Sequence, residues 1–347
     1  MHMENRGLQG AITGIGSLPY DDAGRALDVI FSSFPEIPFW PQLPKRDPRE
    51  GMVPQFIEHI PCVKWFQDGI VFDARRSDEE LEIFYDRLIA VDTEYFKISR
   101  AFAFGLYGFY ERLEKADLNR ITCIKCHVTG PFTFAASITD ENGAALLHNP
   151  VFMQVIIKAI AMKALWQIRL FKKFNKKIIV FLDEPYLGAF GSAYTPINRE
   201  DVIRGLSEIT EGINAEGALS GVHCCGNTDW SIFTGVKTLD IINFDAFGFL
   251  DRVLLYADSL KPFLLRGGML CWGIVPTQDF SAELTVDDLF KRIRAGLDAL
   301  EKKGLTAKTV LENMLLSPSC GLGTLDASAP EKIFSLLLKL SSRIRTV

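Results

Sequence analysis

The stretch "KIIVFLDEP" (residues 177–185) decides the fold, because it is a short apolar run rich in β-branched residues that ends in two carboxylates and a proline. A run of this kind is typical of a buried strand in a parallel sheet. A long apolar helix is predicted before it, at 151–174, and another helix is predicted to open near Asn198. This alternation of strand and helix predicts a parallel sheet with crossover helices.

The same alternation runs through the rest of the chain. The further strand-like runs are "AITGIGS" (11–17), "IPFWPQLP" (37–44), "ITCIKCHVTGP" (121–131), "LSGVHCC" (219–225), "DIINFDAF" (240–247), "GGMLCWGIVP" (267–276) and "NMLLSPSCGL" (313–322). Helical patterns separate them, at 21–34, 251–264, 284–303 and 330–344. At 347 residues, we predict an α/β fold with a single (β/α)8 TIM barrel over 1–347, and an open doubly wound sheet is the alternative.

The region 45–120 does not fit one strand–helix unit. It holds a strand-like "GIVFDA" (69–74) followed by a long helical pattern from about Ser77 to Lys115. We therefore predict a helical insertion or cap at about 45–120, in the N-terminal third of the barrel.

Composition excludes several function classes. The chain is 48% hydrophobic and 23% charged, with a net charge of -5, so it lacks the basic stripe of a nucleic-acid-binding protein. The first residues contain no apolar core of a secretory signal. Lys158, Lys163 and Arg169 interrupt the apolar stretch at 151–171, which favours a buried helix over a membrane span. Seven scattered cysteines are expected to be reduced thiols, so we expect a cytoplasmic protein with no membrane or nucleic-acid partner.

Polar residues gather at the carboxyl ends of the predicted strands, where the barrel fold carries its chemistry. These residues are Ser17, Gln42, Thr129, Asp183, Glu184, His223, Cys225, Asp245 and Cys320. A barrel would bring them to one face although they are far apart in the chain.

His223 and Cys225 carry the metal-binding signal. Residues i and i+2 of an extended strand point to the same side, so this pair can offer an imidazole nitrogen and a thiolate to one ion, ligands that zinc prefers. Cys224 between them is expected to face the other way and pack. Cys320 lies in a turn of Ser, Pro and Gly, where a purely structural cysteine is unusual. Asp245 is either a ligand, a partner of a ligand, or a helix-capping or loop aspartate.

The "CIKC" stretch (123–126) is a weaker signal. Residues i and i+3 of a strand point to opposite faces, so Cys123 and Cys126 cannot share an ion without a turn between them. We interpret them as structural, and His127 as a polar residue with satisfied hydrogen bonds.

Three segments, "GVHCCGN" (221–227), "IINFDAF" (241–247) and "SPSCGLG" (317–323), resemble the zinc-binding segments of cobalamin-independent methionine synthase. They also resemble the related methylcorrinoid-dependent thiol methyltransferases of the uroporphyrinogen decarboxylase superfamily. The resemblance implies zinc on His223, Cys225 and Cys320, with Asp245 at the position where the synthases use glutamate.

Further segments extend the resemblance. "TGIGSLP" (13–19) is similar to the loop that holds the homocysteine carboxylate, through Gly16 and Ser17, and "HVTGPFTF" (127–134) is similar to a Thr-Gly-Pro loop that includes Thr129. "LDEP" (182–185) supplies Asp183, which the resemblance implies as the catalytic residue that meets the substrate ammonium. We predict Gln42 as a further substrate-binding residue. The chain is about as long as the catalytic half of a synthase, and a "His-Gly-Glu-Phe" stretch is missing, so the insertion is a candidate source of replacement contacts.

These features together predict an enzyme that moves a methyl group to a zinc-bound small thiol, with homocysteine favoured. The expected donor is a methylcorrinoid protein rather than folate. Two alternatives stay open: a lyase similar to uroporphyrinogen decarboxylase, and a non-catalytic barrel that binds a thiol or a corrinoid.

Overall fold

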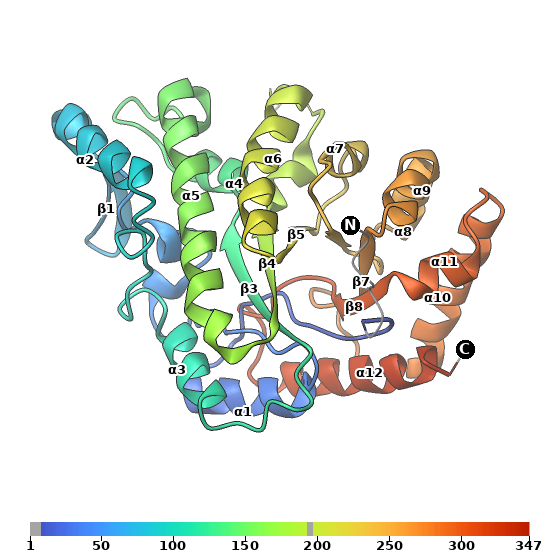
Figure 1. Cartoon of the computed structure of the whole chain (residues 1–347). Coiled ribbons are helices and arrows are strands. Elements are labelled where there is room, and N and C mark those ends of the chain that lie inside the picture. The colour runs from blue at the N-terminus through green and yellow to red at the C-terminus, as the bar shows by residue number, and fades with distance from the viewer. Residues whose placement is uncertain (1–7, 193–196, 347) are drawn as a thin grey trace.

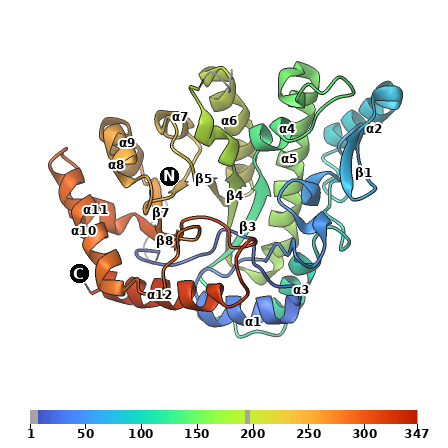
Figure 2. The same ribbon diagram turned by 180° about the vertical axis from the view of Figure 1, so that it is seen from behind.

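A parallel sheet of six strands forms the centre of the protein (Figure 1). The computed structural model describes residues 8–192 and 197–346. The strands pair in sequence order and are β3 (Cys123–Thr129), β4 (Lys177–Asp183), β5 (Leu219–Cys224), β6 (Ile241–Phe244), β7 (Met269–Val275) and β8 (Met314–Pro318). Helices surround this sheet on its outer side in both views (Figures 1 and 2). The predicted α/β class with a parallel sheet is confirmed.

Every residue of the six strands except Lys177 is buried, which explains the continuous apolar runs in the sequence. Alternate residues then divide between two cores. The outward side chains join the large core under the helices. The inward ones form a second cluster that includes Cys123, Ile179, Phe181, Leu219 and Cys271. The sheet is therefore curled around a packed interior.

The two predicted strands nearest the N-terminus are not regular strands, so a full eight-stranded barrel is not formed by regular ladders. Residues 11–17 and 37–44 pair only through isolated parallel bridges, Ile12 with Leu316, Ser17 with Gln42, and Phe39 with Lys125. Pro38 and Pro41 have no backbone N–H to donate, and a side chain at Gly14 would collide with the ring of Phe39. These local constraints prevent a continuous ladder in this part of the chain.

The predicted helices at 21–34, 151–174, near Asn198, 284–303 and 330–344 are confirmed, the one at 251–264 is divided in two, and three short helices are added. Together they are α1 (Ala23–Ser33), α4 (Pro131–Ala136), α5 (Pro150–Phe171), α6 (Arg199–Ala215), α7 (Ser231–Gly235), α8 (Leu250–Val253), α9 (Ala257–Leu265), α10 (Val286–Glu301), α11 (Ala307–Glu312) and α12 (Ala329–Ile344). The segment Pro150–Phe174 is long and apolar enough to cross a membrane, but most of it is buried in the fold. Lys163 on α5 is buried because its ammonium donates to the carbonyl of Glu58, 2.6 Å away.

The predicted helical region from Ser77 to Lys115 is wrong as a single helix. It contains α2 (Ser77–Ile89) and α3 (Phe104–Leu113), with no helix between them. Helix α3 belongs to the outer layer, because the ring of Phe109 lies 5.5 Å from that of Phe31 on α1. The part of the predicted insertion that lies outside the layer of helices around the sheet therefore ends before α3.

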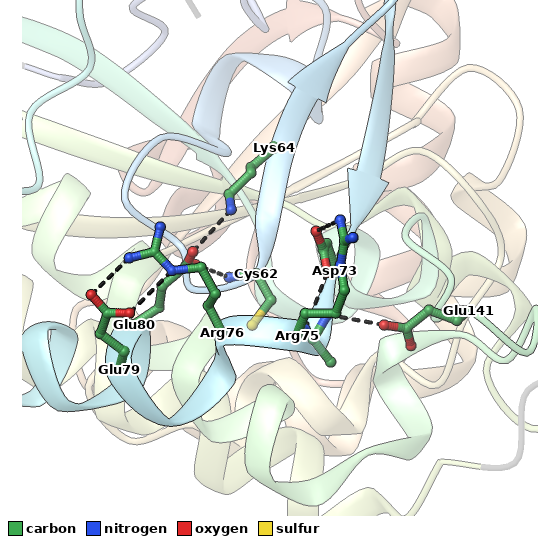
Figure 3. A network of polar contacts seen from close by, with 9 residues as sticks. Cys62, Lys64, Asp73, Arg75, Arg76, Glu79, Glu80 and Glu141 are labelled. Carbon is green, nitrogen blue, oxygen red and sulfur yellow. Dashed lines mark hydrogen bonds and ion pairs between the residues drawn. The ribbon is translucent and has the colours of Figure 1, made fainter.

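A small hairpin forms the outer part of the insertion. Its strands are β1 (Val63–Phe66) and β2 (Gly69–Phe72), which are antiparallel. Figure 3 shows the polar contacts around it. Glu80 on α2 accepts from the Cys62 amide at 2.7 Å and pairs with Lys64, and Glu141, beyond α4, accepts from the Ala74 amide at 2.9 Å. These bonds hold the hairpin to α2 and to the loop beyond α4.

Glu184 joins the loops that follow β3 and β4. Its buried carboxylate accepts from the amides of Phe132 and Thr133 at 3.0 and 2.9 Å and from the Thr133 hydroxyl at 2.7 Å. A Cβ at Gly130 would lie 2.2 Å from the Glu184 carboxyl carbon, so the close approach requires glycine. The sequence motifs "TGP" and "DEP" are thus the two sides of one contact.

Gly130→Ala should reduce the free energy of unfolding by about 2 kcal/mol, because the new methyl group forces Glu184 away from its donors. Gly212→Ala on α6 is the matched control, since its Cβ would meet only Leu165 at 3.8 Å. That change should stabilise the protein by about 0.5–1 kcal/mol. Urea unfolding measures both values, and equal effects of the two changes would contradict the contact.

The pH dependence of stability offers a second test of Glu184. Burial raises the pKa of Glu184 to about 7, although the bonds from Thr133 and Phe132 favour the ionised form. An unfolded glutamate titrates near about 4.3, so the folded protein binds this proton more tightly, and the contribution of Glu184 falls as pH rises from about 4.3 to about 7. The free energy of unfolding of the wild type minus that of Glu184→Gln should therefore decrease over this window. If this difference, measured by urea unfolding, stays constant or rises over the window, then the folded protein does not bind the Glu184 proton more tightly than the unfolded protein does.

Candidate metal centre

A cavity of about 330 Å³ opens at the carboxyl ends of the strands. It is lined by Ile15, Ser17, Gln42, Pro44, Glu50, Met52, Asp183, Pro185, His223, Cys225, Thr277, Gln278, Cys320, Gly321, Gly323, Thr324 and Leu325. Strands β4, β5 and β8 end at this cavity, the N-terminal bridged segments supply another side that includes Pro44, and the insertion closes it with Glu50 and Met52. The curled sheet therefore brings most of the predicted site residues to one space.

His223, Cys225 and Cys320 lie together in this cavity. Their potential ligand atoms are all within 4.8 Å of one another. The ring of His223 is buried, and its Nδ1 is hydrogen-bonded to the side-chain oxygen of Asn243, whereas Nε2 has no partner among the described residues. A buried nitrogen without a partner is unfavourable unless a ligand satisfies it.

The pKa values of the two thiols shift in opposite directions. A hydrogen bond with Cys320 lowers the pKa of Cys225, and the same bond, together with burial, raises the pKa of Cys320. Burial opposes a charge on His223, but its contacts with Cys320, Asp183 and Asn243 raise its pKa overall. These shifts show that Cys320 interacts electrostatically with both Cys225 and His223.

This donor set fits zinc. One imidazole nitrogen and two thiolates are ligands that zinc binds, and three protein ligands leave a fourth position for water or substrate, as in catalytic zinc sites. Cys224 cannot join them, because it is fully buried in the outer core with the side chains that pack against the helices. The expected alternation of Cys224 and Cys225 is confirmed.

Close backbone contacts hold the loops that carry the two cysteines. A Cβ at Gly226 would lie 2.8 Å from the Cα of Gly188, so the loop after β5 lies directly against the loop after β4. The Ser17 carbonyl accepts from the Leu322 amide at 2.9 Å, and its hydroxyl accepts from the Gly323 amide at 3.3 Å. Ser17 thus fixes the turn that contains Cys320, a role that the sequence did not indicate.

Asp245 is not part of the group of three. Its carboxylate accepts from the Gly248 amide at 2.7 Å, in the loop before α8, and burial raises its pKa. It is close enough to His223 for their charges to interact. The geometry therefore favours the interpretation of Asp245 as a loop aspartate. Three residues remain as candidate metal ligands.

Asp183 and Gln42 face the cavity with free acceptor atoms. Asp183 is buried at 4% exposure and its Oδ1 has no partner among the described side chains and backbone. Burial raises its pKa, while Lys125 and His223 act in the opposite direction. The Gln42 amide nitrogen donates to the Gln55 side-chain oxygen at 2.8 Å, which leaves the Gln42 oxygen for a donor in the cavity.

Thr129 and Gly16 are not among the residues that line the cavity. The Thr129 hydroxyl donates to the carbonyl of Met52, so it joins β3 to the insertion. A Cβ at Gly16 would lie 2.9 Å from the His127 ring. The backbone packs too closely against this ring for any residue larger than glycine. Their predicted contact with substrate stays a prediction, and these packing contacts are their observed roles.

The interpretation of His127 as a satisfied polar residue is wrong. Its ring is fully buried, and neither ring nitrogen has a hydrogen-bond partner in the described part of the chain. The ring stacks on Trp40 with centroids 3.8 Å apart, and burial moves its pKa well below the usual value. Cys123 and Cys126 lie in the inner and outer cores respectively, as expected for structural residues.

Sequence reasoning misses several polar residues of the cavity and its surroundings, among them Asn243 and Glu50. Asn243 precedes Asp245 by two positions on the strand predicted at 240–247, so the period of two could have found it. Glu50 is fully buried, with its carboxylate bound to Arg46 and to the Gly105 amide at 3.2 Å. No local pattern in the insertion signals that Glu50 reaches the cavity.

Comparisons with known proteins give one distant relative. No known protein-family profile matches the chain. A methionine synthase of Methanocaldococcus jannaschii is 26% identical over 217 residues, which are 61% of this chain and 62% of that protein. The chain thus spans less than two thirds of the length of the relative that it matches. This similarity is consistent with a distant methionine-synthase-like protein.

Solved structures resemble the chain only weakly. A β-methylaspartase from Clostridium tetanomorphum has a TM-score of 0.38 at 11% identity, covering 79% of this chain and 56% of that one. A D-psicose 3-epimerase has a TM-score of 0.37 at 13% identity, covering 70% and 84%. An endo-β-1,4-mannanase from Cellulomonas fimi has a TM-score of 0.36 at 12% identity, covering 67% and 57%. These values are too low to bear on function.

The purified protein should bind about one zinc ion per chain through the three grouped residues. Cys320→Ser and His223→Gln should each lose most of this zinc, because each removes a donor atom. Cys224→Ala is the matched control, since it changes the neighbouring thiol, which lies in the outer core. Elemental analysis after dialysis measures the zinc content. Equal loss in Cys224→Ala, or no uptake by the folded wild type, would contradict the site.

Proposed function

We propose that this protein transfers a methyl group to the sulfur of a small thiol, with zinc held by His223, Cys225 and Cys320. The observation that carries the proposal is the buried, unpartnered Nε2 of His223 beside two thiols in a cavity at the strand ends. Zinc, when bound there, would supply the positive charge that favours the deprotonated, nucleophilic form of the substrate thiol. The distant similarity to a methionine synthase supports the same class of reaction.

The cavity lining favours an amino thiol as the acceptor. Asp183 offers an unpartnered carboxylate oxygen to a substrate ammonium group. The Ser17 hydroxyl accepts from Gly323, so its own proton is free to be donated to a substrate carboxylate. Gln42 offers its side-chain oxygen. Homocysteine combines the thiol, ammonium and carboxylate groups that this set recognises, and it is the favoured acceptor.

The methyl donor is proposed to be a methylcorrinoid protein rather than folate. The described residues that line the cavity include no lysine or arginine, so the lining offers no cation to the carboxylates of a polyglutamyl folate. The same feature argues against a lyase similar to uroporphyrinogen decarboxylase, which would need cations for its tetrapyrrole carboxylates. A carrier protein would instead present its methyl group at the cavity mouth.

The zinc-loaded protein should methylate homocysteine when supplied with a methylcorrinoid protein. Cys320→Ser should reduce the rate by about 100-fold or more, because the thiol is no longer held in its reactive form. Asp183→Asn should raise KM for homocysteine but not for 3-mercaptopropionate, which lacks the ammonium group. Cys224→Ala should keep the wild-type rate. Product methyl thioether is measured by mass spectrometry.

A folded, zinc-loaded wild type that methylates neither thiol in a single turnover would exclude the enzyme assignment and leave a thiol- or corrinoid-binding protein. An equal rise in KM for both thiols in Asp183→Asn would exclude the role of Asp183 in binding the ammonium group.

A further inference from the structure

Asn243 has a single possible orientation in the structure. Its side chain is fully buried on β6, and its amide nitrogen lies 2.9 Å from the carbonyl oxygen of Cys271 on β7. A carbonyl can only accept a hydrogen bond, so the atom of Asn243 that faces it must be the nitrogen. The side-chain oxygen of Asn243 therefore faces the Nδ1 of His223.

Ser317 on β8 anchors the second hydrogen of this amide. The Asn243 nitrogen donates to the Ser317 hydroxyl at 2.8 Å, and that hydroxyl donates to the carbonyl of Pro318 at 2.9 Å. Rotating the amide by half a turn would place its oxygen against the Cys271 carbonyl and its N–H groups against His223. The contact of two oxygen atoms would be repulsive in a buried site, and the Cys271 carbonyl would lose its donor. The hydrogen bonds are therefore donated in one direction, from His223 on β5 to Asn243 on β6, and from Asn243 to β7 and β8.

The consequence is a fixed tautomer of His223. Because the Asn243 oxygen can only accept, Nδ1 of the histidine must carry the proton, and the lone pair of Nε2 is left free. Nε2 is the ring nitrogen without a partner. The same network ends at Ser317 and Pro318, immediately before the turn that carries Cys320, so it connects the strands that supply both kinds of metal ligand.

We infer that Asn243 is a positioning residue that holds His223 in its Nδ1–H tautomer, with Nε2 directed to the metal position, and that Ser317 anchors Asn243. This inference rests on the proposed metal site for its purpose, but the tautomer and the orientation follow from the hydrogen bonds alone. Partners of this kind for a ligating histidine change metal affinity by about 10- to 100-fold when they are removed.

The tautomer is tested first, in the metal-free protein. The ¹⁵N chemical shifts of histidine-labelled protein, at a pH where the ring is neutral, should show His223 with its proton on Nδ1. The signal is assigned by its loss in His223→Gln. Asn243→Leu, which has a similar shape and no acceptor, should shift the ring to a mixture of tautomers. An unchanged Nδ1–H tautomer in Asn243→Leu would overturn the inference.

Metal affinity is tested second, by competition with a zinc chelator. Asn243→Leu should raise Kd about 10- to 100-fold, and the absorption bands of the Co²⁺-substituted protein should shift, because the ligand field changes. Ser317→Ala should raise Kd by a smaller factor. Ser220→Ala is the matched control, because Ser220 is a buried serine on the opposite face of β5 whose hydroxyl donates to the Thr238 carbonyl at 2.7 Å. Its Kd should not change.

If Asn243→Leu does not fold, Ser317→Ala tests the inference in its place. This change removes one hydrogen-bond partner of Asn243 and keeps the bond between Asn243 and His223. A Kd in Ser317→Ala equal to that of Ser220→Ala would then overturn the inference. If the wild type binds no metal but Asn243→Leu changes the tautomer, the proposed function fails and the positioning role stands. If zinc binds and the tautomer is independent of Asn243, the function stands and the positioning role fails.

Discussion

The parallel register of β4, β5 and β6 is the constraint on which the rest of the site depends. It places Asp183 beside His223 and His223 beside Asn243 in adjacent strands, all with side chains on the inner face. The backbone then extends this order beyond the strands, because the Glu184 amide donates to the His223 carbonyl at 2.8 Å. A slip of one residue would turn these side chains to the outer face and exchange the polar cavity for apolar core.

The loops above the sheet keep this arrangement through contacts that leave no room for a side chain. Gly130 lies against Glu184, Gly226 against Gly188, and a Cβ at Gly321 would lie 2.2 Å from the Ser17 hydroxyl. Each contact joins the loop of one strand to that of another. The cavity is therefore shaped by backbone contacts as well as by the residues that line it, and a methyl group at any of these glycines would force a neighbouring loop or side chain to move.

The sequence predicts the grouping of His223, Cys225 and Cys320 better than it predicts the surroundings of these residues. Period two along one extended segment identifies His223 and Cys225, and the parallel order of the strands brings Cys320 to them. Thr129 was expected at the substrate but its hydroxyl bonds to Met52, and His127 was expected to be satisfied but stacks on Trp40 without partners. These outcomes depend on the path of the insertion and of residues 11–17 and 37–44, where glycines and prolines replace a regular pattern. Local sequence cannot fix contacts that such a path decides.

The polar network of Asn243 also has a consequence for folding. His223 lies on β5 and Cys225 directly follows it, whereas Cys320 follows β8, so the proposed metal position cannot form until β6 and β7 have paired between them. Asn243 donates to both β7 and β8, and these bonds form only in the correct register. A mispaired β6 would bury an amide with no partners, which is unfavourable by about 1–3 kcal/mol for each unsatisfied group. The residue that we propose to orient His223 therefore also favours the strand pairing that brings Cys320 into place, so that the geometry of the proposed site and the native register are stabilised by the same hydrogen bonds.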